Sequence, residues 1–251
     1  MPERQQQGGV APPAINFQKL SLAFNGEVLF DDFSTTIPAG SCTCLLGPSG
    51  CGKSTLLKIV SGNPNLDYDG WVSFSGGDTP GISWMAQNDL LLPWLSVLDN
   101  VLLGAKLRSE TTPALRYRAE QLLSEAGLAG LGAKLPSELS GGMRQRVALL
   151  RTLMENRPVI LMDEPFSALD ALTRMKLQNL AARLIQGKTV LMVTHDPMEA
   201  MRLADRVLVL RGRPAHLVYS LDMDGQTPRD PEDSQVQHGY VQLVKLLMEE
   251  S

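Results

Sequence analysis

A glycine-rich segment constrains the fold of this chain more than any other feature. Residues 47–55 read GPSGCGKST and fit the pattern G-x-x-x-x-G-K-[ST]. The short apolar run Ser41–Leu46 precedes the segment and predicts a strand, while Lys53–Ser61 predicts a helix that ends at Gly62. This strand, glycine loop and helix together are typical of an α/β fold.

Each residue type in this loop suits the binding of phosphate. Glycines let consecutive backbone N–H groups point inward, and the helix N-terminus adds unsatisfied donors and the positive end of its dipole. Lys53 offers a point charge to β- and γ-phosphate oxygens, and the Ser54 hydroxyl can bind Mg²⁺. The alternative is a glycine-rich turn with an exposed lysine. The expected nucleotide-binding residues are Gly47, Pro48, Ser49, Gly50, Cys51, Gly52, Lys53, Ser54 and Thr55.

Two acidic residues follow a second apolar run. Val159–Met162 and Thr189–Val193 lack polar alternation, which is the pattern of strands buried on both faces of a parallel sheet. Asp163 and Glu164 come directly after the first of them, at the sheet edge where ligands bind. Because side chains alternate along a strand, the two acids point different ways, so one can serve Mg²⁺ through its water while the other polarises an attacking water. A solvated turn is the alternative.

Ser140, Gly141 and Gly142 form a second candidate anion site. Ser140 can cap a helix, and the two glycines let its N–H groups face an anion. A plain helix cap explains Ser140 equally well without any ligand. The helices expected beyond this point cover Arg144–Glu155, Ala171–Ile185 and Pro197–Leu203, the last with Asp196 as its N-cap.

The rest of the chain predicts an added β part and an added helical part. Ile15–Phe24 and Val28–Ile37 flank Asn25-Gly26, a dipeptide that favours a hairpin turn between antiparallel strands. Residues 88–142 lack buried-strand runs and show helical spacing, so they predict a helical insertion into the α/β core. Residues beyond about 212 are acidic and weakly patterned until a short amphipathic stretch at Val241–Met248.

Composition excludes several other classes of protein. The chain has 251 residues, 43% of them hydrophobic, which favours a globular fold over disorder. Its formal net charge of −4 does not indicate general nucleic-acid binding. The sequence contains no uninterrupted run of eighteen apolar residues, so it does not predict a membrane span. Cys42, Cys44 and Cys51 show no paired spacing, and we expect reduced thiols of a cytosolic protein.

The position of Ser140-Gly141-Gly142 between the glycine loop and Asp163-Glu164 resembles the signature of ABC-type ATPases. In that family the signature closes over the nucleotide held by a second, facing subunit. The remaining family motifs follow in order, and the resemblance extends from about Ile15 to Arg211. They are a Q-loop glutamine, Gln87; a D-loop, Ser167-Ala168-Leu169-Asp170; a switch histidine, His195; and an adenine-stacking aromatic, Phe24.

Taken singly, these residues have simpler explanations. A glutamine after a strand is usually polar surface, a histidine beside a helix start is usually a solvated cap, and Phe24 by default belongs to the core. The ordered set implies more. It assigns catalysis to Glu164, His195, Gln87 and Lys53, Mg²⁺ binding to Ser54, Gln87 and Asp163, and nucleotide contact also to Asp170.

The resemblance implies a P-loop NTPase core of the ABC ATPase type with an N-terminal antiparallel β part and a helical insertion. Its bounds are a flexible arm at 1–13, an ATPase domain at 14–212 with the insertion at about 88–157, and a short tail at 213–251 without a regulatory domain. The implied activity is ATP hydrolysis with Mg²⁺, at the interface of two copies of the chain.

Leu90–Val101, which reads LLLPWLSVLDNV, looks like the subgroup that energises uptake of nitrate, taurine, alkanesulfonates and thiamine-related pyrimidines. This implies a peripheral protein on the cytoplasmic face of the inner membrane. Its partners are membrane permease subunits, which dock near Leu90–Leu95, and indirectly a solute-binding protein. A core-filling loop is the alternative for Leu90–Leu95.

Other ATPases remain as alternatives to an importer subunit. A soluble ABC ATPase of iron–sulfur cluster assembly is similar in size and motifs, although the Leu-Leu-Pro-Trp loop argues against it. DNA-repair and chromosome ATPases need long coiled coils between the P-loop and the signature, where this chain has only about 85 residues. P-loop kinases and GTPases do not need Ser140-Gly141-Gly142 followed by Asp163-Glu164.

Overall fold

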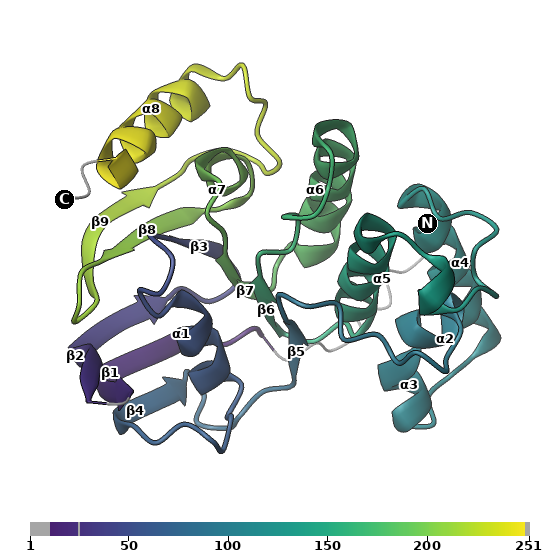
Figure 1. Cartoon of the computed structure of the whole chain (residues 1–251), viewed down its shortest axis with the longest axis horizontal. Helices are drawn as coiled ribbons and strands as arrows, with labels where there is room; N and C mark the ends of the chain where they lie inside the picture. The colour runs from purple at the N-terminus through teal and green to yellow at the C-terminus, as the bar shows by residue number, and fades with distance from the viewer. Residues whose placement is uncertain (1–10, 25, 249–251) are drawn as a thin grey trace, which may run out of the picture.

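A six-stranded sheet forms the centre of the protein, which we describe from a computed structural model that covers residues 11–24 and 26–248. The sheet has the order β5-β6-β7-β3-β8-β9, with β9 antiparallel to β8 and all other neighbours parallel (Figure 1). The strands are β5 (Ile82–Met85), β6 (Val159–Asp163), β7 (Thr189–Val193), β3 (Cys42–Leu46), β8 (Arg206–Arg211) and β9 (His216–Asp222). The strands expected from the apolar runs are confirmed as β3, β6 and β7.

Both faces of this sheet are buried. Every residue of β3, β6 and β7 is buried, and successive side chains enter two separate cores. Leu45 packs toward α1 (Lys53–Val60), whereas Cys44 and Leu46 pack on the opposite side. That side is covered by α5 (Gly141–Met154), α6 (Ala171–Ile185) and α7 (Pro197–Leu203). Because both faces of these strands are buried, their sequences are uninterrupted runs of mainly apolar residues.

A three-stranded antiparallel sheet covers the α1 side. Its order is β2-β1-β4, with β1 (Ile15–Phe24), β2 (Glu27–Ile37) and β4 (Asp69–Phe74). The register of β1 and β2 runs from Ile15 opposite Ile37 to Phe24 opposite Glu27, which confirms the expected hairpin. Asn25 of its turn lies outside the described residues, and Gly26 has a φ of +83°.

The chain between β5 and β6 is helical. It contains α2 (Val97–Val101), α3 (Leu103–Leu107), α4 (Pro113–Glu125), a 3₁₀ turn η1 (Pro136–Glu138) and α5. These elements gather at one end of the molecule, beyond β5 (Figure 1). α5 starts earlier than expected, at Gly141, because the Ser140 side chain caps its first turn.

The expectation of a weakly patterned C-terminal tail is wrong. Residues beyond 212 form β9 and a helix, α8 (Ser234–Met248), which packs on α7. The amphipathic part of α8 begins well before Val241, because Val236 and Leu243 are both buried. At Gly239 a Cβ would lie 2.2 Å from Cε of Met201, so glycine permits the close approach of α8 to α7.

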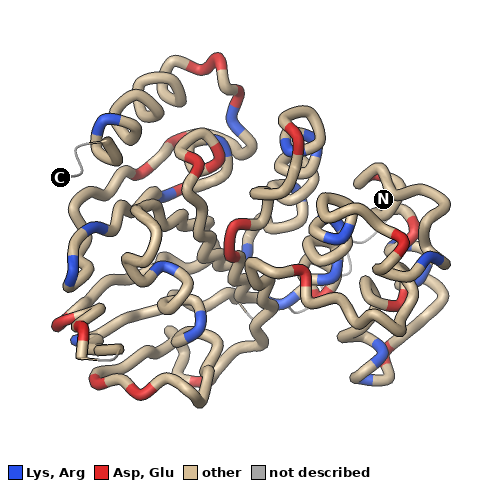
Figure 2. Tube along the Cα trace, in the orientation of Figure 1, with Lys and Arg blue, Asp and Glu red and all other residues tan. Residues whose placement is uncertain are grey.

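Only the end of the expected N-terminal arm is described, because residues 1–10 lie outside the described part of the chain. Pro13 is buried, and its carbonyl oxygen accepts a 2.7 Å hydrogen bond from the Thr189 hydroxyl. Residue 13 is therefore fixed to the sheet and does not belong to a loose arm. Acidic and basic residues are interspersed along the described trace (Figure 2). Within residues 11–24 and 26–248, no helix has the length and apolar character to cross a membrane.

Candidate functional site

The glycine loop joins β3 to α1 in a conformation that only glycine can adopt at two key positions. Gly47 and Gly52 have φ values of +151° and +96°. A Cβ at Gly47 would lie 2.3 Å from the Leu210 carbonyl oxygen, and one at Gly52 would lie 2.5 Å from Cζ of Phe30. The loop therefore requires glycine at both positions, because the backbone has a positive φ there and because a Cβ atom would clash with its neighbours.

Lys53 places its charge inside the curl of this loop. Its side chain is nearly buried, and its Nζ donates hydrogen bonds of 2.6 and 2.7 Å to the carbonyl oxygens of Gly47 and Pro48. Gly52, the residue before α1, has no side chain that could accept from the first N–H groups of the helix. Those donors, the helix dipole and the ammonium group together favour an anion at this point.

The Cys51 side chain also takes part in the loop, because its Sγ accepts a 3.8 Å hydrogen bond from Nζ of Lys53. The Cys51 side chain is buried among apolar residues of the core on the α1 side of the sheet.

Asp163 ends β6 beside the start of α1. Its Oδ1 is buried and has no hydrogen-bond partner among the described residues. Burial raises the pKa of this carboxyl group, while the nearby Ser54 hydroxyl lowers it. An unpartnered carboxylate oxygen next to a hydroxyl is a donor set that suits a hard cation such as Mg²⁺.

Glu164 leaves the strand in a strained backbone conformation. Its φ is +48°, which is rare for a residue with a side chain, and its N–H donates to the Val193 carbonyl oxygen at 2.8 Å. Oε1 of Glu164 lies 3.2 Å from Nδ1 of His195. The Gln145 side-chain amide donates to the Glu164 carbonyl oxygen at 3.1 Å and so fixes the turn from behind.

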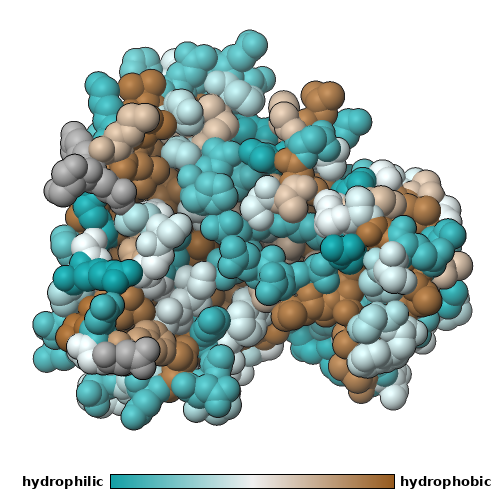
Figure 3. Space-filling view, in the orientation of Figure 1, coloured by the Kyte–Doolittle hydropathy of each residue, from teal (hydrophilic) through white to brown (hydrophobic). Residues whose placement is uncertain are grey.

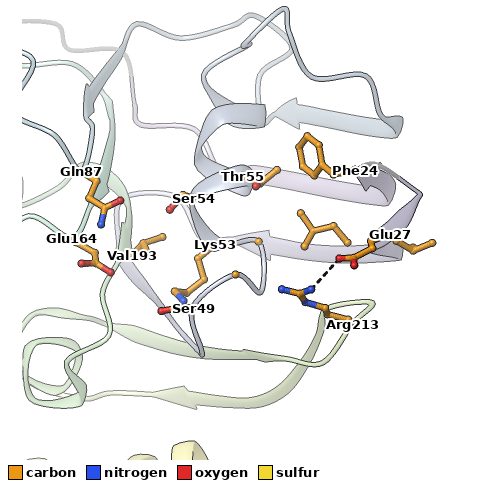
Figure 4. A pocket seen from close by; sticks show the side chains of 14 residues that line it. Phe24, Glu27, Ser49, Lys53, Ser54, Thr55, Gln87, Glu164, Val193 and Arg213 are labelled. Carbon is orange, nitrogen blue, oxygen red and sulfur yellow. Dashed lines mark hydrogen bonds and ion pairs between the residues drawn. The ribbon is translucent and has the colours of Figure 1, made fainter.

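Lys53 and Glu164 line one cavity of about 450 Å³, whereas Asp163 and His195 are not among its lining residues. In Figure 4, Gln87 and Glu164 lie at one end, Lys53 and Ser54 lie between, and Phe24 lies at the far end. Ser49, Gly50, Gly52 and Thr55 also line the cavity. The structure therefore brings six residues of the predicted loop together with Gln87, Glu164 and Phe24, while Gly47, Pro48 and Cys51 do not line the cavity.

The far end of the cavity includes residues that the sequence analysis did not assign. They are Glu27, Val28, Leu29 and Arg213. Arg213 pairs with Glu27 at 3.0 Å, and both lie below Phe24 in the view of Figure 4. Arg213 follows β8 in the segment that was interpreted as a tail, and only the antiparallel turn to β9 reveals its position.

Ser140, Gly141, Gly142 and Asp170 do not line the cavity within this chain. Ser140 Oγ accepts a hydrogen bond from the N–H of Met143 at 3.3 Å and caps α5. Asp170 accepts from the N–H of Thr173 at 3.0 Å and caps α6, and this bond lowers its pKa. The capping interpretation of Ser140 is therefore confirmed, and a role in nucleotide contact stays a prediction for both segments.

The segment Leu90–Leu95 divides into buried and exposed parts. Leu91 is only 8% exposed and belongs to the core, whereas Leu90 and Trp94 are 62% and 72% exposed. Asn100, which is fully buried, fixes the loop: its Oδ1 accepts from the Leu92 N–H at 2.8 Å and its Nδ2 donates to the Leu95 carbonyl oxygen at 3.1 Å. The segment is therefore neither a loop that only fills the core nor a loop that is exposed along its whole length.

Comparisons with known proteins show the family to which the chain belongs. Residues 30–167 match the family described as "ABC transporter". The chain belongs to this family. An uncharacterized ABC transporter ATP-binding protein of Haemophilus influenzae is 44% identical over 221 residues, which are 86% of this chain and 91% of that protein.

One more relative and one solved structure are also similar to this chain. An aliphatic sulfonates import ATP-binding protein of Pseudomonas syringae pv. tomato is 44% identical over 84% of this chain and 88% of its own length. The solved dimer of the ATP-binding cassette MJ0796, in a post-hydrolysis state bound to ADP and Pi, has a TM-score of 0.74 and 29% identity. It matches 84% of this chain and 99% of its own. The P-loop fold of ABC ATPases expected from the sequence is therefore confirmed.

Proposed function

We propose that this chain is the ATP-hydrolysing subunit of an ABC importer. The observation that carries the proposal is a single cavity in which the phosphate loop faces Glu164, while Glu164 Oε1 lies 3.2 Å from His195. The names of the relatives, an ABC transporter ATP-binding protein and a sulfonate import ATP-binding protein, support it.

The proposed reaction is in-line attack of water on the γ-phosphate of ATP. The backbone of residues 47–52 and the Lys53 ammonium group would hold the phosphates and offset their charge. Glu164 would orient and polarise the attacking water, and His195 would hold the γ-phosphate beside it. Phe24, at the opposite end of the cavity, would stack on the adenine.

The residues present fit a magnesium ion. Ser54, Gln87 and the unpartnered Oδ1 of Asp163 supply the oxygen ligands that this ion prefers. When bound, Mg²⁺ would neutralise charge on the β- and γ-phosphate oxygens.

A second copy of the chain is the proposed partner for the exposed signature segment. Ser140 and Gly141 are exposed at the start of a 14-residue helix, where the positive end of the dipole faces solvent. We propose that Ser140, Gly141, Gly142 and Asp170 contact the nucleotide held by the facing copy. The dimeric MJ0796 structure supports this arrangement.

A membrane permease is the proposed second partner, docking near Leu90–Leu95. Figure 3 shows apolar side chains gathered between β5 and α3, where Trp84 and Leu107 line a cleft. Arg151 also lines this cleft and donates to the Leu90 carbonyl oxygen at 2.8 Å, which joins the cleft to the exposed loop. An exposed apolar surface with a tryptophan is typical of a protein interface.

We infer that the protein lies at the cytoplasmic face of the membrane and acts indirectly with a solute-binding protein. The sulfonate import relatives favour a small organic or inorganic anion as the transported solute, with thiamine-related pyrimidines as the further class. The same names favour an importer over a soluble ATPase of iron–sulfur cluster assembly.

Glu164→Gln tests the proposed reaction. The variant should bind ATP as well as the wild type but hydrolyse it at least ~100-fold more slowly, because the base that positions water is lost. It should also accumulate an ATP-bound dimer on a sizing column. Glu232→Gln, at an exposed acid outside the cavity, is the matched control and should hydrolyse ATP normally. Wild-type hydrolysis by Glu164→Gln would show that the assignment is wrong.

A further inference from the structure

Arg174 of α6 connects two loops that meet at the catalytic end of the cavity. Its guanidinium group donates to the Leu169 carbonyl oxygen at 3.1 Å and to Oδ2 of Asp196 at 3.0 Å. Its Nε lies 3.7 Å from Oε1 of Glu199. One side chain thus contacts the turn that follows β6 and the turn that follows β7.

The turn after β7 is held on both sides of His195. Asp196 accepts from the N–H of Met198 at 2.8 Å through Oδ1, and its own N–H donates to the Thr194 hydroxyl at 3.1 Å. The Thr194 hydroxyl in turn donates to Oε2 of Glu199 at 2.7 Å. The position of His195 therefore depends on Asp196 and Glu199, the two acids that Arg174 contacts.

The turn after β6 is held on Glu164 in a similar way. Ser167 Oγ donates to the Glu164 carbonyl oxygen at 3.1 Å, and the Leu169 N–H donates to the Phe166 carbonyl oxygen at 3.3 Å. Gln145 bonds to both the Glu164 carbonyl oxygen and the Ala168 N–H. Arg174 therefore bridges the segment that carries Glu164 and the segment that carries His195.

The bridge is made of polar side chains, of which Glu199 is buried while Arg174 and Asp196 are partly exposed. The Glu199 side chain is 4% exposed and that of Arg174 is 32% exposed, and Nε of Arg174 is buried with no hydrogen-bond partner among the residues that the structure describes. Burying an ion pair rarely adds stability over apolar packing. The planar fork of arginine, in contrast to the single ammonium group of lysine, can contact three acceptors on two loops at once.

We propose that Arg174, with Asp196 and Glu199, is a positioning cluster that keeps His195 against Glu164. The cluster acts through these two residues and does not touch the nucleotide. The inference rests on the proposed ATPase function and adds to it a link between the D-loop and the switch histidine.

Arg174→Ala tests the link by separating turnover from binding. We expect kcat for ATP to fall by between about tenfold and about a hundredfold, because loss of the bridge misplaces a reacting group. KM for ATP should stay within about twofold, since no residue of the phosphate loop is changed. Arg174→Lys should restore part of kcat through its charge. Arg183→Ala is the matched control: it lies on the same helix, and its side chain pairs with Glu125 at the surface.

A double-mutant cycle separates positioning from general stability. Asp196→Asn keeps a side chain that can cap α7 but loses the charge that Arg174 contacts. If the two residues act through one link, the double variant should be no slower than the slower single variant. Independent, multiplicative losses would overturn the proposal, as would a rise in KM that matches the fall in kcat.

Failure of this inference is distinguishable from failure of the proposed function. A wild-type protein without ATPase activity would refute the proposed function. Wild-type activity together with equal rates for Arg174→Ala and Arg183→Ala would refute only the positioning cluster.

Discussion

Replacing Glu199 by glutamine tests a carboxyl group that the fold keeps almost completely buried. Burial raises its pKa from an ordinary 4.5 to about 7. This value is the net result: Asp196 also acts to raise the pKa, whereas the hydrogen bond from Thr194 and the charges of Arg174 and His195 act to lower it. Cys44 of β3 lies close enough on the sheet side for the Glu199 charge to raise the pKa of its thiol.

The direction of the effect on stability follows from these values. The unfolded chain loses the Glu199 proton first as pH rises, so the folded state binds more protons between pH 4.5 and 7. The stability contributed by the protonated group is complete below the unfolded pKa and is lost as pH rises through the folded pKa. At 1.36 kcal/mol per pKa unit, the whole loss is about 3 kcal/mol.

Glutamine cannot ionise, so Glu199→Gln should not show this loss. The free energy of unfolding of the variant minus that of the wild type should increase by about 2.5 kcal/mol between pH 5 and pH 8. Urea unfolding of both proteins at the two pH values, at one ionic strength, measures this difference. A difference that stays constant from pH 5 to pH 8 would refute the reasoning, because Glu199 would then be ionised equally in both states.

Two further predictions concern the C-terminal segment and the docking loop. Arg229 is buried and donates to five backbone carbonyl oxygens, so Arg229→Met should lower the free energy of unfolding, measured in urea, by about 3 kcal/mol or more. Arg206→Met, at a more exposed arginine, is the control. An equal loss of stability in both variants would show that Arg229 does not hold the C-terminal segment in place. Trp94→Ala should reduce co-purification with the permease but leave the thermal midpoint near wild type, whereas Leu91→Asp should cost more than about 3 kcal/mol of stability because that side chain is buried. A large loss of stability in Trp94→Ala would show that Trp94 belongs to the core.

The central strands could be predicted because their signal is local. β3, β6 and β7 are buried on both faces, and each appears in the sequence as an uninterrupted apolar run. The strands at the edges give a weaker signal. β9 alternates between exposed and half-buried residues, and within the described part of the chain it pairs with β8 alone, so its composition resembles that of a polar tail.

The candidate site was predictable to a similar extent and for a similar reason. The phosphate loop and the acids after β6 lie within short segments whose residue types state their chemistry. Arg213, Arg174 and Gln145 gave no such signal, because an arginine or glutamine on a helix or after a strand is usually solvent-exposed. Their positions depend on contacts between residues far apart in the sequence, 19 residues for Gln145 and Glu164 and 22 for Arg174 and Asp196.

Three neighbouring strands meet at the end of the cavity where Glu164 lies. β6, β7 and β3 lie side by side, and the segments after them carry Glu164, His195 and the phosphate loop (Figure 1). Because parallel strands present their carboxyl ends at one edge, each reacting group is held by a different segment. The phosphate loop is curled around the Lys53 ammonium group, and Gln145 fixes the turn after β6. The turn that carries His195 is held instead by the side chains of Arg174 and Glu199. Substitutions in that cluster should therefore move His195 while the phosphate loop keeps its place, which is why we expect turnover to change before nucleotide binding does.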